Sequence, residues 1–485
     1  MKQKSIKLNF IMNTILTISL FVFPLITYPY ISRTLQPAGM GKVSFILSII
    51  TYFNMFAQLG IPTYGVRACA IVRDDKEKLT RTVHEILLIN LLTTLTTYIV
   101  LFFATISIPR LFQEKQLVFV MSFTIILTSI GIEWLYKALE QYTYITIRSL
   151  VFKLISVFAI FLLIHSKGDY VKYGAIATFA SSASYIINLI NVHKYIGLRP
   201  IGNYNFKRHL KPVLIFFAMS IATLIYMNLD TVLLGFMKTD ADVGYYSTAV
   251  KVKGILVSLV TSLGAVLLPR ASYYIENGEI DSFTSLSKKA MNFVFISAIP
   301  LSIYFTIYAK NVIYLLSGSA FHNSILPMRI IMFTLLFIGM SNLTGVQMLV
   351  PLGRENIVLI SEIIGGLINF GINVILIPKF SFIGAAIASV VTEFLIALIQ
   401  YIYLRKEVQG LFGDVSLSKL IIANLLAAIA SSWVIYLNAN DFIILVISAI
   451  LYFGVYYIVL LLTKEKSVLE ISKQIKVKLI GSLNK

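Results

Sequence analysis

The stretch Tyr28–Phe45, YPYISRTLQPAGMGKVSF, separates two long apolar runs near the start of the chain. It contains two prolines, two glycines, one arginine and one lysine, so it is too polar to continue either run. Proline and glycine favour a turn, and each flanking run is close to the roughly 20 residues that a helix needs to cross a bilayer. We therefore predict a hairpin that joins two membrane-spanning helices.

The composition extends this prediction to the whole chain. Of its 485 residues, 58% are hydrophobic and only 13% are charged, about half of the roughly 25% charged residues in a soluble domain. A lipid-exposed backbone must satisfy its own hydrogen bonds, and the apolar runs lack the alternation of a membrane β-barrel. We predict an all-α polytopic membrane protein.

About fourteen spans are expected. The connections between them are short and leave no room for a soluble domain. The spans lie near residues 10–31, 43–65, 82–108, 116–137, 145–165, 172–193, 211–236, 248–269, 289–309, 325–350, 357–378, 381–404, 417–437 and 441–462.

An internal repeat divides twelve of these spans into two sets of six. Three residue pairs recur at a separation of 203 or 204, namely Gly41 with Gly244, Gly60 with Gly264, and Arg67 with Arg270. The segment YGAIATFAS (173–181) likewise resembles IGAAIASVV (383–391). An even number of spans per copy gives both copies the same orientation, so the repeat is parallel. We predict six-helix lobes over 1–198 and 199–406, followed by two peripheral helices and a basic tail over 407–485.

Positive charge is distributed unevenly between alternate loops. The formal net charge is +19, and 28 lysines and arginines lie in one set of loops against 9 in the other. Cytoplasmic loops carry an excess of basic residues, so we predict both termini on the cytoplasmic side and the 28–45 hairpin outside. The partner of these charges is then an anionic membrane leaflet rather than nucleic acid.

Signatures of enzymes and metal sites are missing from the sequence. No Walker A or GxSxG motif occurs. Cys69 is the only cysteine, and the five histidines are scattered without ligand spacing. The sequence GMGK at 39–42 lacks the spacer of a phosphate-binding loop. We expect no enzymatic activity, no bound metal and no cofactor, apart from an ion that could couple to transport.

Charged side chains inside predicted spans are the first candidates for a substrate path, because a charge in lipid is costly unless it faces a cavity or a partner. They are Glu133, Lys153, Asp230, Lys251, Lys253, Arg329, Glu362 and Glu393. The lysines suit an anionic substrate, and the carboxylates could pair with them or carry a coupling proton or sodium ion. Snorkelling to the interface and structural pairing between helices are the alternatives.

Arg67 and Arg270 each end an early span of their repeat copy at the predicted cytoplasmic face. A two-fold arrangement would place them opposite each other at the inner mouth of a path. The guanidinium group of arginine can form two parallel hydrogen bonds to a phosphate, so arginines at this position suit a phosphate-containing substrate. Ordinary anchoring at the cytoplasmic interface is the alternative.

The opening hairpin has a counterpart, GFMKTDADVGYYS (Gly235–Ser247), in the equivalent external turn of the second copy. One turn carries Arg33 and Lys42, and the other carries Asp240 and Asp242. Opposite charges on facing hairpins predict an external gate that closes when the lobes come together. Two solvated turns without such a role are the alternative.

The residues of Tyr28–Ala70, YPYISRTLQPAGMGKVSFILSIITYFNMFAQLGIPTYGVRACA, resemble the start of bacterial polysaccharide repeat-unit flippases. These Wzx-type proteins form the polysaccharide transporter branch of the MATE-like multidrug/oligosaccharidyl-lipid/polysaccharide exporter superfamily. The stretch Asn228–Val252, NLDTVLLGFMKTDADVGYYSTAVKV, is similar to the family's Asp-bearing seventh span and the Gly-Tyr-Tyr turn that follows. One departure is Gln36, where glycine is common in the family, so a looser turn is expected.

The resemblance implies two six-helix lobes around a central cavity that work by alternating access. The implied function is movement of undecaprenyl-diphosphate-linked oligosaccharide from the inner to the outer leaflet of the bacterial cytoplasmic membrane, for capsular or O-antigen-type polysaccharide. Polymerase and chain-length proteins of the same pathway would be partners. A drug/cation antiporter of the same superfamily, a lipid II flippase and, more remotely, a membrane polymerase are the alternatives.

Roles for the candidate residues follow from that implied substrate. Arg67 and Arg270 would receive the diphosphate, and Lys153, Lys251 and Lys253 would hold it midway. Asp230 and Glu362 would couple to an ion, H⁺ or Na⁺, or pair the lobes.

Overall fold

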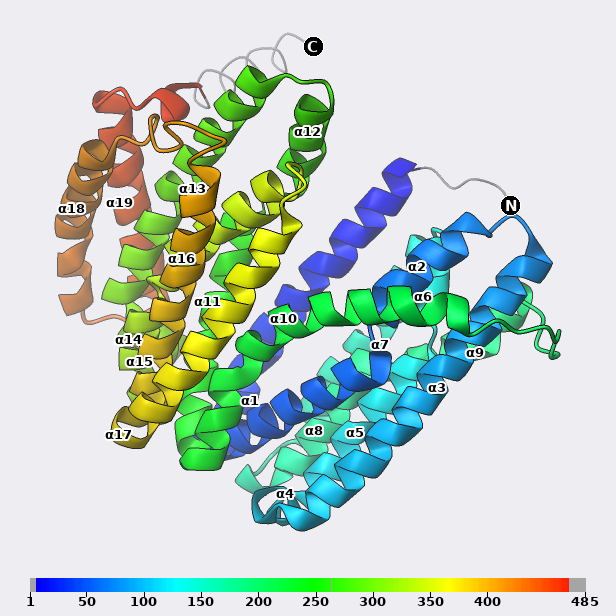
Figure 1. Ribbon diagram of the computed structural model, residues 1–485. Coiled ribbons are helices and arrows are strands. Elements are labelled where there is room, and N and C mark those ends of the chain that lie inside the picture. The colour runs from blue at the N-terminus through cyan, green and yellow to red at the C-terminus, as the bar shows by residue number, and fades with distance from the viewer. Residues whose placement is uncertain (1–5, 263, 471–485) are drawn as a thin grey trace, which may run out of the picture. The chain divides into compact units, whose positions relative to one another are not determined.

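The computed structural model describes residues 6–262 and 264–470, and every regular element in these ranges is a helix (Figure 1). The predicted all-α class is confirmed. The chain forms two compact units, residues 1–244 and 245–485, and each is considered by itself. The lobe limits at 198/199 and 406/407 stay predictions. The basic residues Lys2, Lys4, Lys473, Lys476, Lys478 and Lys485 lie outside the described ranges.

The first unit is organised around its long N-terminal helix, α1. That helix packs against α3, α5, α7 and α10. The helices of the unit are α1 (Ile6–Gln58), α2 (Ile61–Ile71), α3 (Lys76–Ser107), α4 (Pro109–Gln113), α5 (Lys115–Ile130), α6 (Glu133–Ala138), α7 (Tyr142–Leu163), α8 (Tyr170–Thr178), α9 (Tyr185–Asn191) and α10 (Lys207–Met237), with the first residues of α11 (Asp240–Thr261).

The predicted hairpin at 28–45 is a kink within α1 rather than a loop. Two helical segments meet at Gln36, whose φ of 60° lies in the region that favours glycine. Pro37 follows at once, and the Gln36 side-chain amide donates to the Arg33 carbonyl at 2.5 Å. Gln36 therefore occupies a backbone conformation that glycine would adopt with less strain, and its side chain hydrogen-bonds to the preceding turn of the helix.

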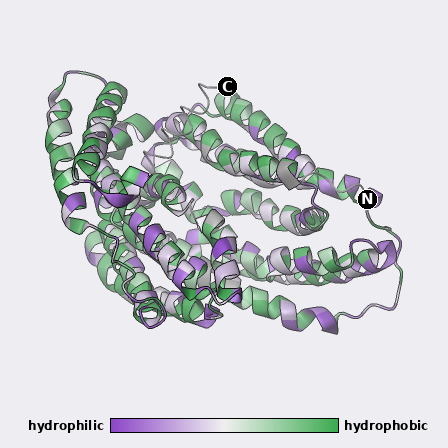
Figure 2. Cartoon of the chain, turned by 90° about the horizontal axis from the view of Figure 1, so that it is seen from above, coloured by the Kyte–Doolittle hydropathy of each residue, from purple (hydrophilic) through white to green (hydrophobic). Residues whose placement is uncertain are grey.

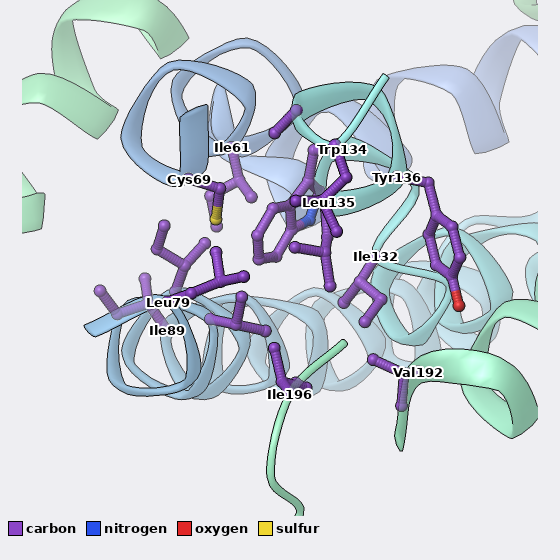
Figure 3. Packing of buried hydrophobic residues seen from close by; sticks show 14 of the residues in the cluster. Ile61, Cys69, Leu79, Ile89, Ile132, Trp134, Leu135, Tyr136, Val192 and Ile196 are labelled. Carbon is purple, nitrogen blue, oxygen red and sulfur yellow. The ribbon is translucent and has the colours of Figure 1, made fainter. Parts of the chain in front are cut away.

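A buried apolar cluster holds the short helices α2 and α6 against α3. Figure 3 shows Trp134 in this cluster with Ile61 and Cys69 of α2 and Leu79 of α3. A β-carbon on Gly65 would lie 2.7 Å from the Trp134 ring, so only glycine lets α2 approach the indole this closely. The cluster fixes the helix that carries Arg67.

The second unit contains the last two membrane helices. Its helices are α12 (Gly264–Glu276), α13 (Ile280–Ile307), α14 (Ala309–Ser317), α15 (Ile325–Ile331), α16 (Thr334–Ser341), the π-helix η5 (Asn342–Leu349), α17 (Glu355–Leu404), α18 (Leu417–Ser432) and α19 (Asp441–Leu462), with most of α11. Tyrosine hydroxyls attach α18 and α19 to the rest. Tyr308 donates to the Ser431 carbonyl of α18 at 2.7 Å, and Tyr456 of α19 donates to the Ile296 carbonyl of α13 at 2.9 Å.

Helix length and apolarity agree with a protein of many spans. In the described residues, eight helices are long and apolar enough to cross a membrane, and a bent pair, Ser319–Ile331 with Thr334–Leu349, makes up to nine. Two of the eight, Leu8–Ile71 and Glu355–Leu404, each cover two predicted spans, and α17 is kinked at Ser381 as α1 is at Gln36. Figure 2 shows hydrophobic residues along much of the long helices. The count of fourteen is compatible with this and stays a prediction.

Candidate functional site

Lys153 is a cation in the middle of a membrane-spanning helix of the first unit. It lies halfway along α7, is half-buried, and donates from Nζ to Ser19 Oγ of α1 at 2.7 Å. No carboxylate of the described residues lies within ion-pair distance of it. A hydroxyl solvates an ammonium group without neutralising it, so the positive charge of Lys153 is available to an anion.

Asp230 is a buried carboxylate of the same unit. It lies on α10 with 6% of its surface exposed, close enough to Tyr52 of α1 for electrostatic interaction. Tyr52 lines a recess of about 450 Å³ between α1 and α3. The recess has aromatic residues on one wall and threonines on the other, and its residues are Tyr52, Phe53, Phe56, Thr93, Thr96, Thr97 and Val100.

Arg67 is exposed on α2, on the side opposite the buried face of that helix. One turn before it, the Tyr64 hydroxyl lies 2.6 Å from His209 Nδ1 of α10. His209 Nε2 lies 2.6 Å from Glu85 Oε2 of α3, and Arg208 Nη2 donates to the same oxygen at 2.6 Å. Arg67 thus stands beside a polar cluster, defined here as Tyr64, Glu85, Arg208 and His209, of which Glu85 and His209 are buried.

Hydrogen bonds of this cluster and of the neighbouring His84 hold the segment between α9 and α10 against α3. Glu85 Oε1 accepts from the backbone N–H of Asn205 at 2.6 Å. His84 contacts the Gly197 carbonyl at 2.9 Å and the Tyr204 hydroxyl at 3.1 Å. The connection between the repeat copies is therefore bound to the first unit, which explains why α10 packs there.

Within the first unit, the two predicted external turns are in direct contact. A β-carbon on Gly41 would overlap the carbonyl oxygen of Asp240, and one on Gly244 would overlap the carbonyl oxygen of Pro37. Pro37 and Asp240 are themselves 203 residues apart, as Gly41 and Gly244 are. The glycine of each turn therefore packs against the same backbone carbonyl of the other turn, at positions related by the repeat.

Two charges of these turns, Asp240 and Lys42, form ion pairs with a third segment, residues 110–114. Asp240 forms its ion pair with Arg110 of α4, and Arg110 Nε also donates to the Gly235 carbonyl at 3.0 Å. Lys42 pairs with Glu114 at 2.5 Å.

The other two gate candidates bond within their own turns. Arg33 is exposed and donates to the Pro29 carbonyl at 2.9 Å. Asp242 closes a capping box with Thr239 at the start of α11, in which Asp242 Oδ2 accepts from the Thr239 amide at 3.2 Å.

The second unit holds the remaining candidates. Lys251 is exposed and Lys253 half-buried on α11, and Arg270 is exposed on α12. Glu362 is half-buried on α17. Neither lysine forms an ion pair with a carboxylate in the part of the chain that the structure describes. Whether Arg67 and Arg270 face each other stays a prediction.

Sequence reasoning missed the partners Glu85, Arg110 and His209. Two signals were present. Glu85 lies inside the predicted span 82–108, and a Lys-Arg-His run at 207–209 precedes the next span. Nothing in the sequence links them, because Glu85 and His209 are 124 residues apart. No group of His, Cys, Asp and Glu residues able to hold a metal occurs in the residues described.

The fold is that of helical membrane transporters. A lipid II flippase MurJ in an inward closed conformation matches with a TM-score of 0.72 and 16% identity, over 93% of this chain and 98% of that one. An inward-facing multidrug resistance MATE family transporter of the MOP superfamily matches with a TM-score of 0.65 and 14% identity, over 83% and 98%. At these identities the likeness shows the fold alone.

Within that class, the chain belongs to the polysaccharide biosynthesis protein family, which it matches over residues 6–275. It is 25% identical over 407 residues to the Escherichia coli protein named "Putative O-antigen transporter", covering 83% of this chain and 97% of that protein. A protein of the same name from Shigella dysenteriae is 25% identical over 398 residues, covering 78% and 94%. The predicted membership of the polysaccharide branch is confirmed. The relatives are named as transporters, in agreement with transport rather than enzymatic activity.

Proposed function

We propose that this protein is a flippase that moves undecaprenyl-diphosphate-linked oligosaccharide repeat units from the inner to the outer leaflet of the bacterial cytoplasmic membrane. The family, the O-antigen transporter relatives and the transporter fold support this function. Both termini lie in the cytoplasm, the side to which the basic loops point. Polymerase and chain-length proteins of the pathway would act on the flipped product.

The observation that carries the proposal is the environment of Lys153. An ammonium group halfway along a membrane-spanning helix is rare and marks a substrate path or a structural pair. Its contact in the described residues is the Ser19 hydroxyl rather than a carboxylate. A diphosphate passing the middle of the membrane would supply the missing negative charge.

The other candidate residues take roles at the two ends of the path. Arg67 and Arg270 receive the diphosphate at the inner mouth, and Lys251 and Lys253 continue the cationic path beside Lys153. Asp230 and Glu362 couple transport to H⁺ or Na⁺ or pair the lobes. The contact of the external turns through Gly41 and Gly244 forms the closed outer gate, in which Arg33, Asp240 and Asp242 take part.

The test is the fate of the lipid-linked oligosaccharide in the producing strain. Deletion of the protein should trap repeat units on the cytoplasmic face, where a membrane-impermeant glycan reagent added to spheroplasts cannot modify them. The wild-type chain should restore modification, and Lys153→Gln should not at equal protein level. The matched control is Lys172→Gln, which changes an exposed lysine paired with Asp169. Repeat units that stay accessible in the deletion strain would disprove flipping.

A lipid II flippase is the second candidate, because it would use the same fold and the same class of diphosphate-linked lipid substrate. The two functions predict different phenotypes. Loss of a surface polysaccharide without lysis identifies the repeat-unit flippase, whereas lysis on depletion identifies a lipid II flippase. Combining Arg67→Glu with Arg270→Glu then tests the inner site, and normal glycan export at equal protein level would disprove it.

A further inference from the structure

A second recess of the first unit lies between α3 and α5, and none of the candidate residues considered above lines it. Its volume is about 460 Å³. Leu101 and Val118 form its floor, each 3% exposed, and Phe102 and Phe119 stand at its rim, 61% and 65% exposed. The recess is therefore a groove on the side of the unit, with a buried floor and an aromatic border.

Three polar side chains in the wall of this groove, Tyr98, Thr105 and Ser122, are already bonded within the protein. The Tyr98 hydroxyl donates to the Ser122 carbonyl, Thr105 Oγ1 to the Leu101 carbonyl and Ser122 Oγ to the Phe119 carbonyl, each at 2.7 Å. The wall consequently offers few hydrogen bonds to a ligand. A hydrocarbon chain fits such a surface, and a sugar does not, because its hydroxyls would be left unsatisfied.

The dimensions of the groove match one leaflet of a bilayer. Its lining residues run over 98–105 of α3 and 115–126 of α5, which correspond to about 10 and 16 Å at 1.5 Å per residue. Half of a hydrocarbon core is about 15 Å thick. One acyl chain of a lipid would occupy it along its length.

Lys115 stands at the end of the groove, as the first residue of α5. It is exposed, and its Nζ lies 4.7 Å from the centre of the Phe112 ring. Neighbouring cations are neutralised, Lys42 by Glu114 and Arg110 by Asp240. Lys115 has no carboxylate within ion-pair distance among the residues that the structure describes.

We propose that this groove is a binding site for an anionic phospholipid, with one acyl chain between α3 and α5 and the headgroup phosphate at Lys115. An acyl chain gains no hydrophobic free energy on leaving the bilayer for the groove, because lipid tails are as apolar as leucine. Selectivity must therefore come from the headgroup end. A single lysine near a membrane surface is worth about a fivefold preference for anionic over zwitterionic lipid.

The test uses the full chain reconstituted in nanodiscs of equal parts phosphatidylglycerol and phosphatidylcholine. The lipids that stay bound after transfer to detergent are counted by native mass spectrometry. The wild type should retain phosphatidylglycerol in about fivefold excess. Lys115→Gln should lower this excess to about onefold. Lys310→Gln is the matched control, since Lys310 is also exposed and lies 5.6 Å from the Tyr314 ring, and it should keep the excess.

A second variant tests the chain site independently of charge. Thr105→Trp places an indole in the groove and should remove one retained lipid per chain. Phe158→Trp, at a 72% exposed position of α7, should not. Equal effects of Lys115→Gln and Lys310→Gln, or full lipid retention in Thr105→Trp, would overturn the proposal. Displacement of phosphatidylglycerol by equimolar undecaprenyl phosphate would also overturn the proposal. A protein dimer that Thr105→Trp abolishes would overturn it too, because a second copy of the chain would then occupy the groove.

Discussion

Gly41 packs against the carbonyl group of Asp240, and Gly244 packs against the carbonyl group of Pro37. The two glycines occupy equivalent positions of a 203-residue repeat, as do the two carbonyl groups. At both contacts the residue that faces the carbonyl group has no side chain. This reciprocal contact is an interface between repeat copies within a single compact unit.

Adding a methyl group at either glycine is expected to open this contact. Gly41→Ala and Gly244→Ala should each lower the stability of the detergent-solubilised protein by about 1–3 kcal/mol, as overpacking does elsewhere, because rigid backbone faces the new β-carbon. Gly254→Ala is the matched control on α11, where a β-carbon meets nothing within 4 Å. It should be neutral or stabilising by up to about 1 kcal/mol. Thermal unfolding of the three variants would decide, and equal midpoints would contradict the contact.

The ion pair between Arg110 and Asp240 should stabilise the same turn. Arg110 uses its fork for Asp240 and for the Gly235 carbonyl, so Arg110→Lys keeps the charge and loses part of the bonding. We expect Arg110→Gln and Asp240→Asn each to cost about 1.5–3 kcal/mol. Their double variant should cost less than the sum of the two. A double-mutant cycle on unfolding midpoints measures this coupling, and strict additivity would rule the pair out as a stabilising contact.

Glycine at position 65 controls how closely α2 approaches α6. Gly65→Ala is expected to destabilise the first unit by about 1–3 kcal/mol, because a β-carbon would lie 2.7 Å from the Trp134 ring. Gly65→Ala combined with Trp134→Leu should recover part of the loss by making room. Arg67 lies on the same helix, so glycan export should follow the stability series in a complementation assay. A Gly65→Ala variant as stable as the wild type would show that the indole moves aside freely.

The sequence predicted the helices far better than the contacts between them. Apolar run length depends on local composition, so the all-α class and a break between two apolar runs at 28–45 could be predicted, whereas the form of that break, a kink at Gln36, could not. The repeat also identified Gly41 and Gly244 as equivalent. The repeat could not show that the segments around these two glycines are in contact, because a repeat is read from the sequence and the contact depends on how the helices pack.

The pairing of charges shows the same limit. Opposite charges on the two external turns predicted a gate with Arg33 and Asp240, and this stays a prediction. The sequence did not indicate that Asp240 also pairs with Arg110 of α4. Periodicity places Arg110 at a span end but cannot say which neighbouring turn it reaches. The partners of Glu85 could not be predicted either, because they lie on a segment more than a hundred residues further along the chain.

The imidazole of His209 should make the stability of the protein depend on pH. Burial, opposed by the Glu85 carboxylate, lowers the pKa of His209 below the ordinary value of about 6.5. A neutral ring can donate from Nε2 to Glu85 and accept at Nδ1 from Tyr64. Below pH 6.5 the unfolded chain takes up this proton first, so the free energy of unfolding falls until the pH passes the folded pKa.

Replacing His209 should therefore change the slope of stability against pH as well as its level. His209→Gln is expected to lower the unfolding midpoint at pH 7.5, because it disrupts the bonds to Glu85 and Tyr64, and to flatten the decline between pH 7.5 and 5. His193→Gln is the control, since His193 is exposed and contacts only the nearby Ile190 carbonyl in the described residues. That variant should keep the wild-type slope. The measurement is the unfolding midpoint of each variant across this pH range. If the midpoints of the wild type and His209→Gln decline in parallel, His209 is not the titrating group.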